Sequence, residues 1–168
     1  MEKIGIIGSG TWGTAISILL HNNGHEVTIW SAIPEEIDEM AATRKHKNLP
    51  EVTLPESLRL TKDLKEAMEG KDLLVMAVPS VFVRSTAKRM KPYLHDGQII
   101  VDVAKGTEES TLFTMSQIIE EELPTAQVAA LSGPSHAEEV SRGLPTTCVA
   151  GAPKKAVAEY IQSVFTSP

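Results

Sequence analysis

The sequence has one cysteine, few aromatic residues and no long apolar run. The single cysteine, Cys148, excludes an internal disulfide framework and a cysteine-based zinc site. No stretch approaches the ~20 uncharged apolar residues of a membrane span. The first residues lead into a strand-like pattern and lack the layout of a signal peptide. We therefore expect a cytoplasmic protein with no membrane span.

Positive charge is also scarce. The 16 Lys and Arg residues are scattered among 22 Asp and Glu residues, which gives a formal net charge of -6. Because a nucleic-acid-binding surface concentrates basic residues, we expect no nucleic-acid partner. The length of 168 residues, with 42% hydrophobic, matches one globular domain. Residues 1–168 are too few for an enzyme that needs both a cofactor domain and a substrate domain.

Short apolar runs alternate with longer amphipathic runs, which is typical of repeated βαβ units around a mostly parallel sheet. The predicted strands are 3–8, 26–30, 58–60, 72–78, 98–103, 127–131 and 146–150. The predicted helices are 12–23, 35–43, a helix from 61 or 62 to 69, 81–90, a stretch marked by Leu112, Met115, Ile118 and Ile119, then 137–142 and 154–165. The predicted fold class is α/β: a doubly wound, mostly parallel Rossmann sheet with helices on both faces.

A glycine-rich turn joins the first predicted strand to the first predicted helix. It reads Gly8-Ser9-Gly10-Thr11-Trp12-Gly13, the G-x-G-x-x-G pattern of dinucleotide-binding turns. In such a turn the first glycine permits the bend, the second lets the backbone approach a pyrophosphate, and the third lets the helix pack on the strand. The N–H groups at the helix start then face the phosphates. These six residues are candidate cofactor contacts, and Trp12 is alternatively a packing residue.

The cofactor's ribose is expected where the second strand ends at Trp30 and Ser31 and Ala32 follow. An acidic residue there would favour NAD and an arginine would favour NADP. Neither is present, so the sequence predicts NAD or NADP without choosing between them. Ser31 is a candidate cofactor contact or, alternatively, a cap of the next helix. Arg44 or Lys45 is a candidate to reach the same place from the following loop.

Other strand ends carry candidate residues, because ligands of doubly wound sheets gather at the carboxyl ends of strands. Pro79 makes a rigid turn that places Ser80 on the nicotinamide side. Lys105, beside Gly106, offers an ammonium to the cofactor or to an anionic substrate. The segment Gly133-Pro134-Ser135 precedes a helix and forms a second anion-binding turn, the expected seat of the substrate.

Histidines offer weaker candidates. His136 is a candidate general base because imidazole titrates near neutrality, but helix starts commonly carry histidine for hydrogen bonding alone. His21 and His25 are four residues apart, yet Gly24 interrupts the helix between them. We therefore expect no metal site.

Together these motifs resemble the NAD(P)-dependent glycerol-3-phosphate dehydrogenases of bacteria. The matching segments, in family order, are Gly8 to Ala15, Gly24 to Trp30, Leu49-Pro50 with Leu54-Pro55, Val78-Pro79-Ser80, Lys105-Gly106, and Leu131 to Val140. The resemblance implies reversible hydride transfer between NAD(P)H and dihydroxyacetone phosphate. The product, sn-glycerol 3-phosphate, serves phospholipid synthesis.

The resemblance also implies site residues. The implied cofactor contacts are Thr11, Trp12, Ala32 (by position), Lys105 and Ala137. The implied substrate contacts are Lys105, Gly133 and Ser135. The family's proton-transferring lysine, in a Lys-Asn motif at the start of a helical C-terminal domain, has no counterpart here. We therefore expect no catalytic residue within this chain. The full-length enzyme could be a homodimer, and the sequence does not decide its oligomeric state.

Two other hypotheses fit the same motifs. The chain could be a stand-alone nicotinamide-binding module that acts as a redox sensor or regulatory partner. It could also belong to a dehydrogenase of the 6-phosphogluconate or hydroxyacyl-CoA type, which shares the cofactor fold and acts on a different substrate.

Overall fold

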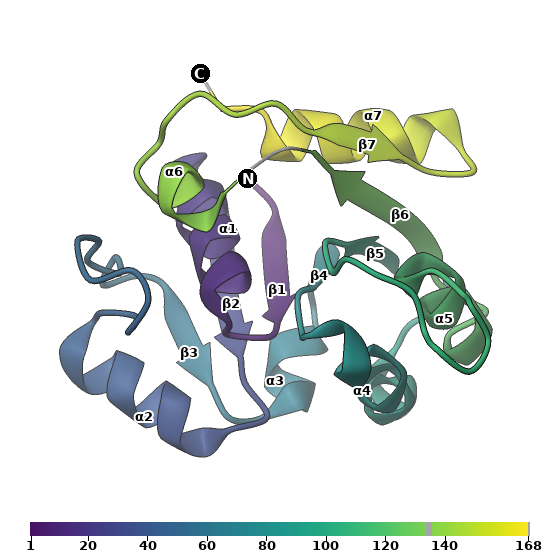
Figure 1. Cartoon of the computed structure of the whole chain (residues 1–168), viewed down its shortest axis with the longest axis horizontal. Coiled ribbons are helices and arrows are strands. Elements are labelled where there is room, and N and C mark those ends of the chain that lie inside the picture. Colours follow the sequence, from purple (N-terminus) through teal and green to yellow (C-terminus); the bar gives the residue numbers. More distant parts are fainter. Residues whose placement is uncertain (134–135, 168) are drawn as a thin grey trace.

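The computed structural model describes residues 1–133 and 136–167 and is built on a seven-stranded sheet (Figure 1). The strand order is β3-β2-β1-β4-β5-β6-β7. The strands are β1 (Lys3–Ile7), β2 (Glu26–Trp30), β3 (Arg59–Thr61), β4 (Leu73–Met76), β5 (Ile99–Asp102), β6 (Gln127–Ser132) and β7 (Val149–Gly151). Neighbouring strands from β3 to β6 are parallel, and β7 pairs antiparallel with β6.

Helices cover both faces of the sheet (Figure 1). They are α1 (Thr11–Asn22), α2 (Pro34–Thr43), α3 (Leu64–Met68), α4 (Val83–Met90), α5 (Met115–Glu122), α6 (Ala137–Ser141) and α7 (Lys155–Phe165). Short 3-10 turns lie at Ser80–Phe82 and Lys91–Tyr93. This arrangement confirms the predicted doubly wound, mostly parallel α/β fold.

Two apolar cores follow from the alternation of side chains along β1. Ile4 and Ile6 are buried in a core that includes Ile161 of α7, whereas Ile7 belongs to a second core with Ile118 of α5. Successive residues of a strand point to opposite faces, so one short strand contributes to both cores. The sheet is therefore buried on both sides, which explains the near-continuous apolar run of β4.

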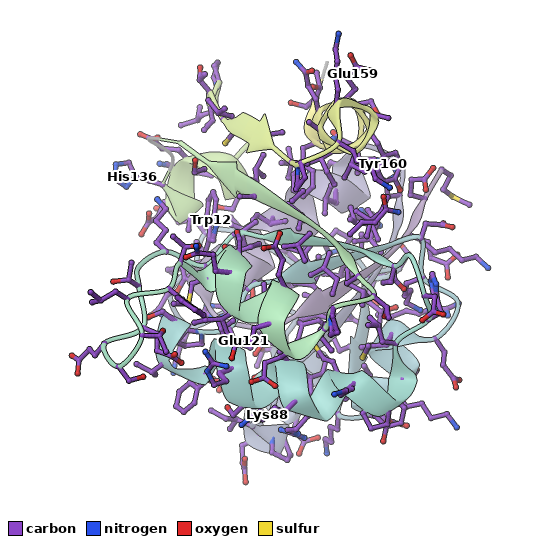
Figure 2. The ribbon with its side chains drawn as sticks, turned by 90° about the vertical axis from the view of Figure 1, so that its right-hand side faces the viewer. Trp12, Lys88, Glu121, His136, Glu159 and Tyr160 are labelled. Atoms are coloured by element: carbon purple, nitrogen blue, oxygen red, sulfur yellow. The ribbon has the colours of Figure 1, made fainter. Side chains whose placement is uncertain are left out.

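Helix α7 is fastened to the beginning of the chain by polar contacts. The Tyr160 hydroxyl donates a hydrogen bond to a Glu2 carboxylate oxygen at 2.7 Å, and Tyr160 lies on the inner side of α7 (Figure 2). The Asn23 side-chain amide donates to the Val164 carbonyl at 3.2 Å. The last helix thus closes over the first strand and the end of α1.

Two sequence predictions were wrong in detail. Leu112 was placed in a helix, but it has a left-handed φ of 62° and is 76% exposed. Helix α5 begins only at Met115, where Thr114 and Gln117 form a capping box. The last strand was expected at 146–150 and is β7, Val149–Gly151. Before it the chain runs close to Gly133, since a Cβ on Gly133 would lie 2.5 Å from the Thr147 carbonyl oxygen.

Candidate functional site

The strand register brings the predicted site segments to one edge of the sheet. Ile7 is paired with Trp30 and with Met76, Met76 with Asp102, and Asp102 with Ala130. The predicted site residues that follow these paired positions within three residues are Gly8, Ser9, Gly10, Ser31, Ala32, Pro79, Lys105 and Gly133. The strand order reverses between β1 and β4, so the glycine turn lies at the switch point where ligands of such folds bind.

The glycines of the turn have different surroundings. Gly8 has a φ of 124°, and a Cβ there would lie 2.7 Å from the Ala77 carbonyl carbon. A Cβ on Gly13 would lie 2.5 Å from the Gly8 carbonyl oxygen, so this glycine lets α1 pack against the strand end. A Cβ on Gly10 would meet nothing within 4 Å among the described residues. Bend and packing thus account for Gly8 and Gly13, whereas Gly10 borders open space.

The start of α1 is suited to an anion. Gly10 is its N-cap, with no side-chain capping hydrogen bond, and the first turn contains no acidic residue. The N–H groups of Thr11, Trp12 and Gly13 precede the first intrahelical hydrogen bond, which Thr14 donates to the Gly10 carbonyl. The positive end of the helix dipole therefore faces the open side of Gly10.

Trp12 and Ala137 lie together in a small apolar cluster. Both pack partly buried against Ala15, Leu49 and Val140, which joins the start of α6 to α1. The Trp12 indole N–H is buried and has no hydrogen-bond partner among the described residues. The packing role that the sequence offers as an alternative for Trp12 is therefore present in the structure.

A large cavity lies next to this cluster. Its volume is about 780 Å³, and Trp12, Leu131, Val140, the segment 143–150 and α7 line it. Among the predicted site residues that the structure describes, Trp12 lines this cavity, and so does Leu131 near the carboxyl end of β6. The strand register, rather than the cavity, locates the candidate site.

The end of β2, where the sequence predicts the cofactor's ribose, contains a carboxylate that the sequence analysis missed. We call this place, formed by Ser9, Ser31, Ala32 and Glu36, the ribose corner. Ser31 is buried, and its hydroxyl donates to Glu36 Oε2 at 2.9 Å and accepts from the Ile33 N–H at 3.0 Å. Ser9 donates to the same Glu36 oxygen at 2.7 Å. The N-cap of α2 is Ile33, so Ser31 is not the helix cap of the alternative hypothesis. Ala32 is exposed at this corner.

The two basic candidates for the ribose corner, Arg44 and Lys45, form hydrogen bonds within their own loop. Arg44 donates to the Leu58 carbonyl at 3.0 Å, and the Lys45 ammonium donates to the Pro50 carbonyl at 3.1 Å. Both side chains therefore hold the loop between α2 and β3.

His46 from that loop supports the glycine turn, a role the sequence did not indicate. Its Nδ1 accepts from the Asn48 N–H at 3.1 Å, so the proton is on Nε2, which donates to the Ser9 carbonyl at 3.0 Å. Burial lowers the pKa of His46, and the ring is therefore neutral near pH 7. The Asn48 amide also donates to Thr11 Oγ1 at 2.9 Å.

The loops after β4 and β5 lie side by side. A Cβ on Gly106, which has a φ of 112°, would be 3.8 Å from the Ser80 hydroxyl oxygen. Pro79 starts the 3-10 turn and accepts a hydrogen bond from the Phe82 N–H at 2.9 Å. Lys105 is exposed and directly precedes Gly106. The structure therefore brings Pro79 and Lys105 to neighbouring loops.

A buried carboxylate stands at the end of β5. Asp102 accepts hydrogen bonds from the Ala104 N–H at 2.9 Å and the Ser116 hydroxyl at 3.2 Å. Burial raises the pKa of Asp102 to about 6, and these two hydrogen bonds oppose the rise. Asp102 thus shapes the turn that leads to Lys105.

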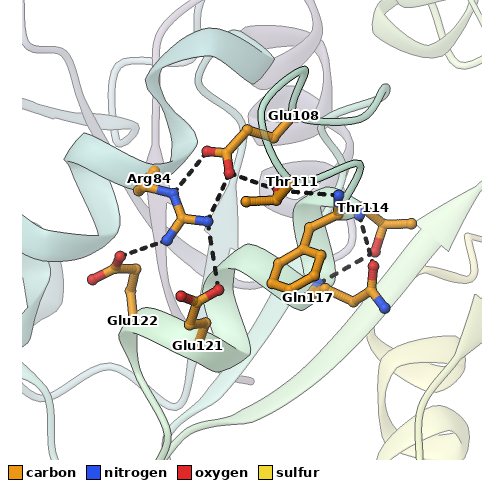
Figure 3. A network of polar contacts seen from close by, with 8 residues as sticks. Arg84, Glu108, Thr111, Thr114, Gln117, Glu121 and Glu122 are labelled. Carbon is orange, nitrogen blue, oxygen red and sulfur yellow. Dashed lines mark hydrogen bonds and ion pairs between the residues drawn. The ribbon is translucent and has the colours of Figure 1, made fainter.

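An ion-pair network fixes the far side of the same loop (Figure 3). Arg84 Nε and Nη2 contact the two oxygens of Glu108 at 2.7 and 2.8 Å, and Arg84 Nη1 contacts Glu122 at 2.7 Å. Glu121 lies 3.5 Å from Nη2. Thr111 donates to Glu108 at 2.8 Å. The guanidinium hydrogen bonds lower the pKa of Glu108 to about 2.

The predicted substrate turn is described only at its two ends. Pro134 and Ser135 lie outside the described residues, so the structure does not place the Ser135 candidate contact. Gly133 packs against the Thr147 backbone, as noted above. His136 is an exposed N-cap of α6 without a side-chain capping bond, and its ring projects outward (Figure 2).

The described part of the chain has neither a metal-binding cluster nor a membrane-spanning helix. In residues 1–133 and 136–167, no group of three or more His, Cys, Asp or Glu side chains could hold a metal ion. No helix in the same part of the chain has the length and apolar character needed to cross a membrane.

The sheet order, the glycine turn and the open start of α1 define a doubly wound nucleotide-binding domain. Residues 3–158 match the family described as the NAD-dependent glycerol-3-phosphate dehydrogenase N-terminus, and the chain belongs to this family. The resemblance seen in the sequence is thereby confirmed. The expected cofactor class, NAD or NADP, is confirmed at the level of this family.

Individual relatives agree with this assignment. The chain is 54% identical over 171 residues to a glycerol-3-phosphate dehydrogenase (NAD(P)+) of Fusobacterium nucleatum, covering 100% of this chain and 51% of that protein. A second relative, from Lactobacillus delbrueckii subsp. bulgaricus, is 50% identical over 98% of this chain and 51% of its own length. The crystal structure of glycerol-3-phosphate dehydrogenase from Coxiella burnetii superposes with a TM-score of 0.93 at 30% identity, covering 99% of this chain and 51% of that one. The chain therefore spans about half the length of these relatives.

Proposed function

We propose that residues 1–168 act as one domain that binds NAD(H) or NADP(H) for a glycerol-3-phosphate dehydrogenase. The observation that carries the proposal is the open start of α1 at the switch point between β1 and β4. The free side of Gly10 leaves room for a pyrophosphate, and the N–H groups of Thr11, Trp12 and Gly13 are placed to donate to it. When the cofactor is bound, its nicotinamide ring supplies or accepts the hydride.

The substrate is proposed to be the pair dihydroxyacetone phosphate and sn-glycerol 3-phosphate, bound beside the nicotinamide. Lys105 and Gly133 each follow a paired position, Asp102 and Ala130, by three residues, and both lie beyond the carboxyl ends of neighbouring strands. The exposed ammonium of Lys105 gives this edge a positive charge suited to a phosphate or a carbonyl oxygen. Ser135 is proposed to contribute to the same turn.

The chain is proposed to bind its ligands with little turnover. Hydride addition to a ketone produces an alkoxide that a general acid must protonate. The Asp102 carboxyl is buried and already accepts two hydrogen bonds, and His136 projects outward from α6. The resemblance to the family implies a proton-transferring lysine in a helical C-terminal domain, and we propose that this lysine lies outside these 168 residues.

Calorimetric titration with NADH and NADPH, followed by an assay of NADH oxidation with dihydroxyacetone phosphate, tests this function. We expect binding of at least one nucleotide, and turnover roughly a hundredfold or more below that of the full-length Fusobacterium nucleatum relative. If neither nucleotide binds, the cofactor proposal is wrong. If the chain turns over as fast as the relative, the expectation of binding without turnover is wrong.

The substrate class is tested separately by binding in the presence of NAD+. We expect dihydroxyacetone phosphate to raise the melting temperature of the chain and CoA thioesters to leave it unchanged. The reverse would favour a dehydrogenase of the hydroxyacyl-CoA type. A response to the nucleotides alone would favour the redox-sensor hypothesis.

The cellular setting is also a proposal. We infer that the enzyme acts in the cytoplasm, supplies glycerophospholipid synthesis and has no nucleic-acid partner. The support is the net charge of -6 with scattered basic residues, and the chemistry of the proposed product. A homodimer is proposed only for a full-length form.

A further inference from the structure

The Glu36 carboxylate lies between the end of β2 and the glycine turn. Its Oε2 accepts hydrogen bonds from Ser9 Oγ at 2.7 Å and Ser31 Oγ at 2.9 Å. Ser9 belongs to the turn after β1, and Ser31 directly follows β2, while the last residues of these strands, Ile7 and Trp30, are paired. The carboxylate therefore connects the two strand ends between which a Rossmann fold binds the adenosine ribose.

The local structure of α2 brings Glu36 to this place. In the common form of the fold, the acidic residue that contacts the ribose stands at the end of β2 itself. In this chain Ser31 occupies the position directly after β2. The side chain of Glu36, in the first turn of α2, contacts Ser31, and the helix dipole favours a negative charge at that turn. The Glu36 N–H donates to the Ile33 carbonyl at 3.1 Å, which fixes the start of that turn.

The charges around this corner favour a neutral sugar over a phosphate. Glu36 is half-buried, and its Oε1 accepts no hydrogen bond from any residue in the described part of the chain. The side chains of Arg44 and Lys45 are bonded to carbonyls of their own loop. His46, which donates to the Ser9 carbonyl, is neutral. A free carboxylate oxygen is thus the group offered to the ribose.

We propose that Glu36 makes this site select NAD(H) over NADP(H), an inference that rests on the proposed cofactor function. The ionised carboxylate accepts hydrogen bonds from the ribose hydroxyls of NAD(H). In NADP(H) a 2′-phosphate replaces the hydroxyl donor and adds about two negative charges beside the carboxylate. The second nucleotide therefore loses a hydrogen bond and is repelled.

Calorimetric titration of NADH and NADPH against the wild-type chain and two variants tests the inference. Glu36→Gln removes the charge while keeping the side-chain shape. Glu35→Gln is the matched control, because Glu35 is exposed in the same helical turn and its loss changes the net charge equally. We expect the wild type to bind NADH roughly tenfold or more tightly than NADPH, and Glu36→Gln to reduce this ratio by about tenfold. The control should leave the ratio within about twofold.

A salt titration of the wild type gives a readout that needs no variant. If a carboxylate repels the 2′-phosphate, added salt screens the repulsion, and the NADH-to-NADPH affinity ratio falls. If cations bind the phosphate, the ratio rises with salt instead, and the inference is overturned. Equal or tighter binding of NADPH, or an unchanged ratio in Glu36→Gln, also overturns it while leaving the cofactor proposal intact. Failure of both nucleotides to bind overturns both.

Discussion

The guanidinium of Arg84 contacts both carboxylate oxygens of Glu108, at 2.7 and 2.8 Å. Arg84 belongs to α4, which follows the Pro79 turn, and Glu108 lies three residues after Lys105. The pair therefore fastens the loop after β5 to the helix after β4. Two candidate loops that the sequence separates by more than twenty residues are held in one arrangement.

Replacing Arg84 with Gln is expected to lower the melting temperature at pH 7 by a few degrees, because Glu108, Glu121 and Glu122 would lose their shared cation. Lys88→Gln, which removes an exposed positive charge from the same helix, is the control and should have little effect. Thermal unfolding followed by circular dichroism measures both.

The same variant should show a defined pH dependence. The pKa of Glu108 is lowered from 4.5 to about 2, so its ionised form is favoured in the folded state. The stability it contributes is fully present above pH 4.5 and is lost as the pH falls toward 2. The difference between wild type and Arg84→Gln should therefore shrink over this range. A difference that stays constant would contradict the role given to Glu108.

Asp102→Asn is expected to stabilise the chain at pH 8 by about 1–3 kcal/mol. The pKa of Asp102 is raised from 3.8 to about 6, so the folded state holds the proton more tightly than the unfolded state. Wild-type stability from this group is therefore present below pH 3.8 and is lost as the pH rises through 6. Asparagine stays neutral and avoids that loss.

Urea unfolding at several pH values measures the effect of Asp102→Asn. The gain should disappear below pH 3.8, where Asp102 is protonated in both states. Asp96→Asn, at an exposed position, is the control and should give no gain. A gain of equal size at every pH would show that the charge of Asp102 is not its cause.

Gly13→Ala is expected to lower the stability of the chain, whereas Gly10→Ala is expected to weaken nucleotide binding. A Cβ on Gly13 would lie 2.5 Å from the Gly8 carbonyl oxygen, so this variant should lose about 1–3 kcal/mol of stability. A Cβ on Gly10 meets no described atom within 4 Å, so stability should change by less than about 1 kcal/mol. Calorimetry should nevertheless show NADH binding to Gly10→Ala weakened on the order of tenfold, because the methyl group enters the pyrophosphate cradle. Unchanged binding would argue against this turn as the phosphate site.

Ala32→Arg is expected to raise NADPH affinity roughly tenfold, because a guanidinium beside Ser31 can pair with a 2′-phosphate. Ala32 is exposed, so the fold should tolerate the longer side chain. Ala42→Arg adds the same charge at an exposed position near the other end of α2 and serves as the control. If NADPH affinity does not change at Ala32, the ribose corner has been placed wrongly.

The fold was predictable where the determining signal is local. The apolar run around β4 and the amphipathic spacing of α7, with Val157, Ile161 and Val164 buried, both arise from burial against the sheet, so periodicity located them. Periodicity was misleading at Leu112. This apolar residue has helical spacing to Met115, yet it lies in a loop with a left-handed backbone conformation. The capping box of Thr114 and Gln117 was the better local sign of where α5 begins.

The candidate site also contains residues that the sequence predicted and residues that it could not predict. The glycine turn could be predicted because its G-x-G-x-x-G spacing lies within one short segment of sequence, although Gly8 is also required by its close approach to the Ala77 backbone. Glu36 could not, because it reaches the ribose corner through contact with Ser9, 27 positions away. The contact of Arg84 with Glu108 spans 24 positions and has no local signature either. Both depend on the finished sheet order, which periodicity does not specify.

The closure of α7 over β1 has a consequence for synthesis of the chain. Tyr160 and Glu2 are 158 positions apart, and the core beside Ile4 and Ile6 is completed by residues of α7. On a translating ribosome, this apolar face of the first strand thus stays only partly covered, by α1 and its neighbours, until nearly the whole domain has emerged. During that interval this face is open to chaperones or to other nascent chains. Such long-range contacts also slow folding after release.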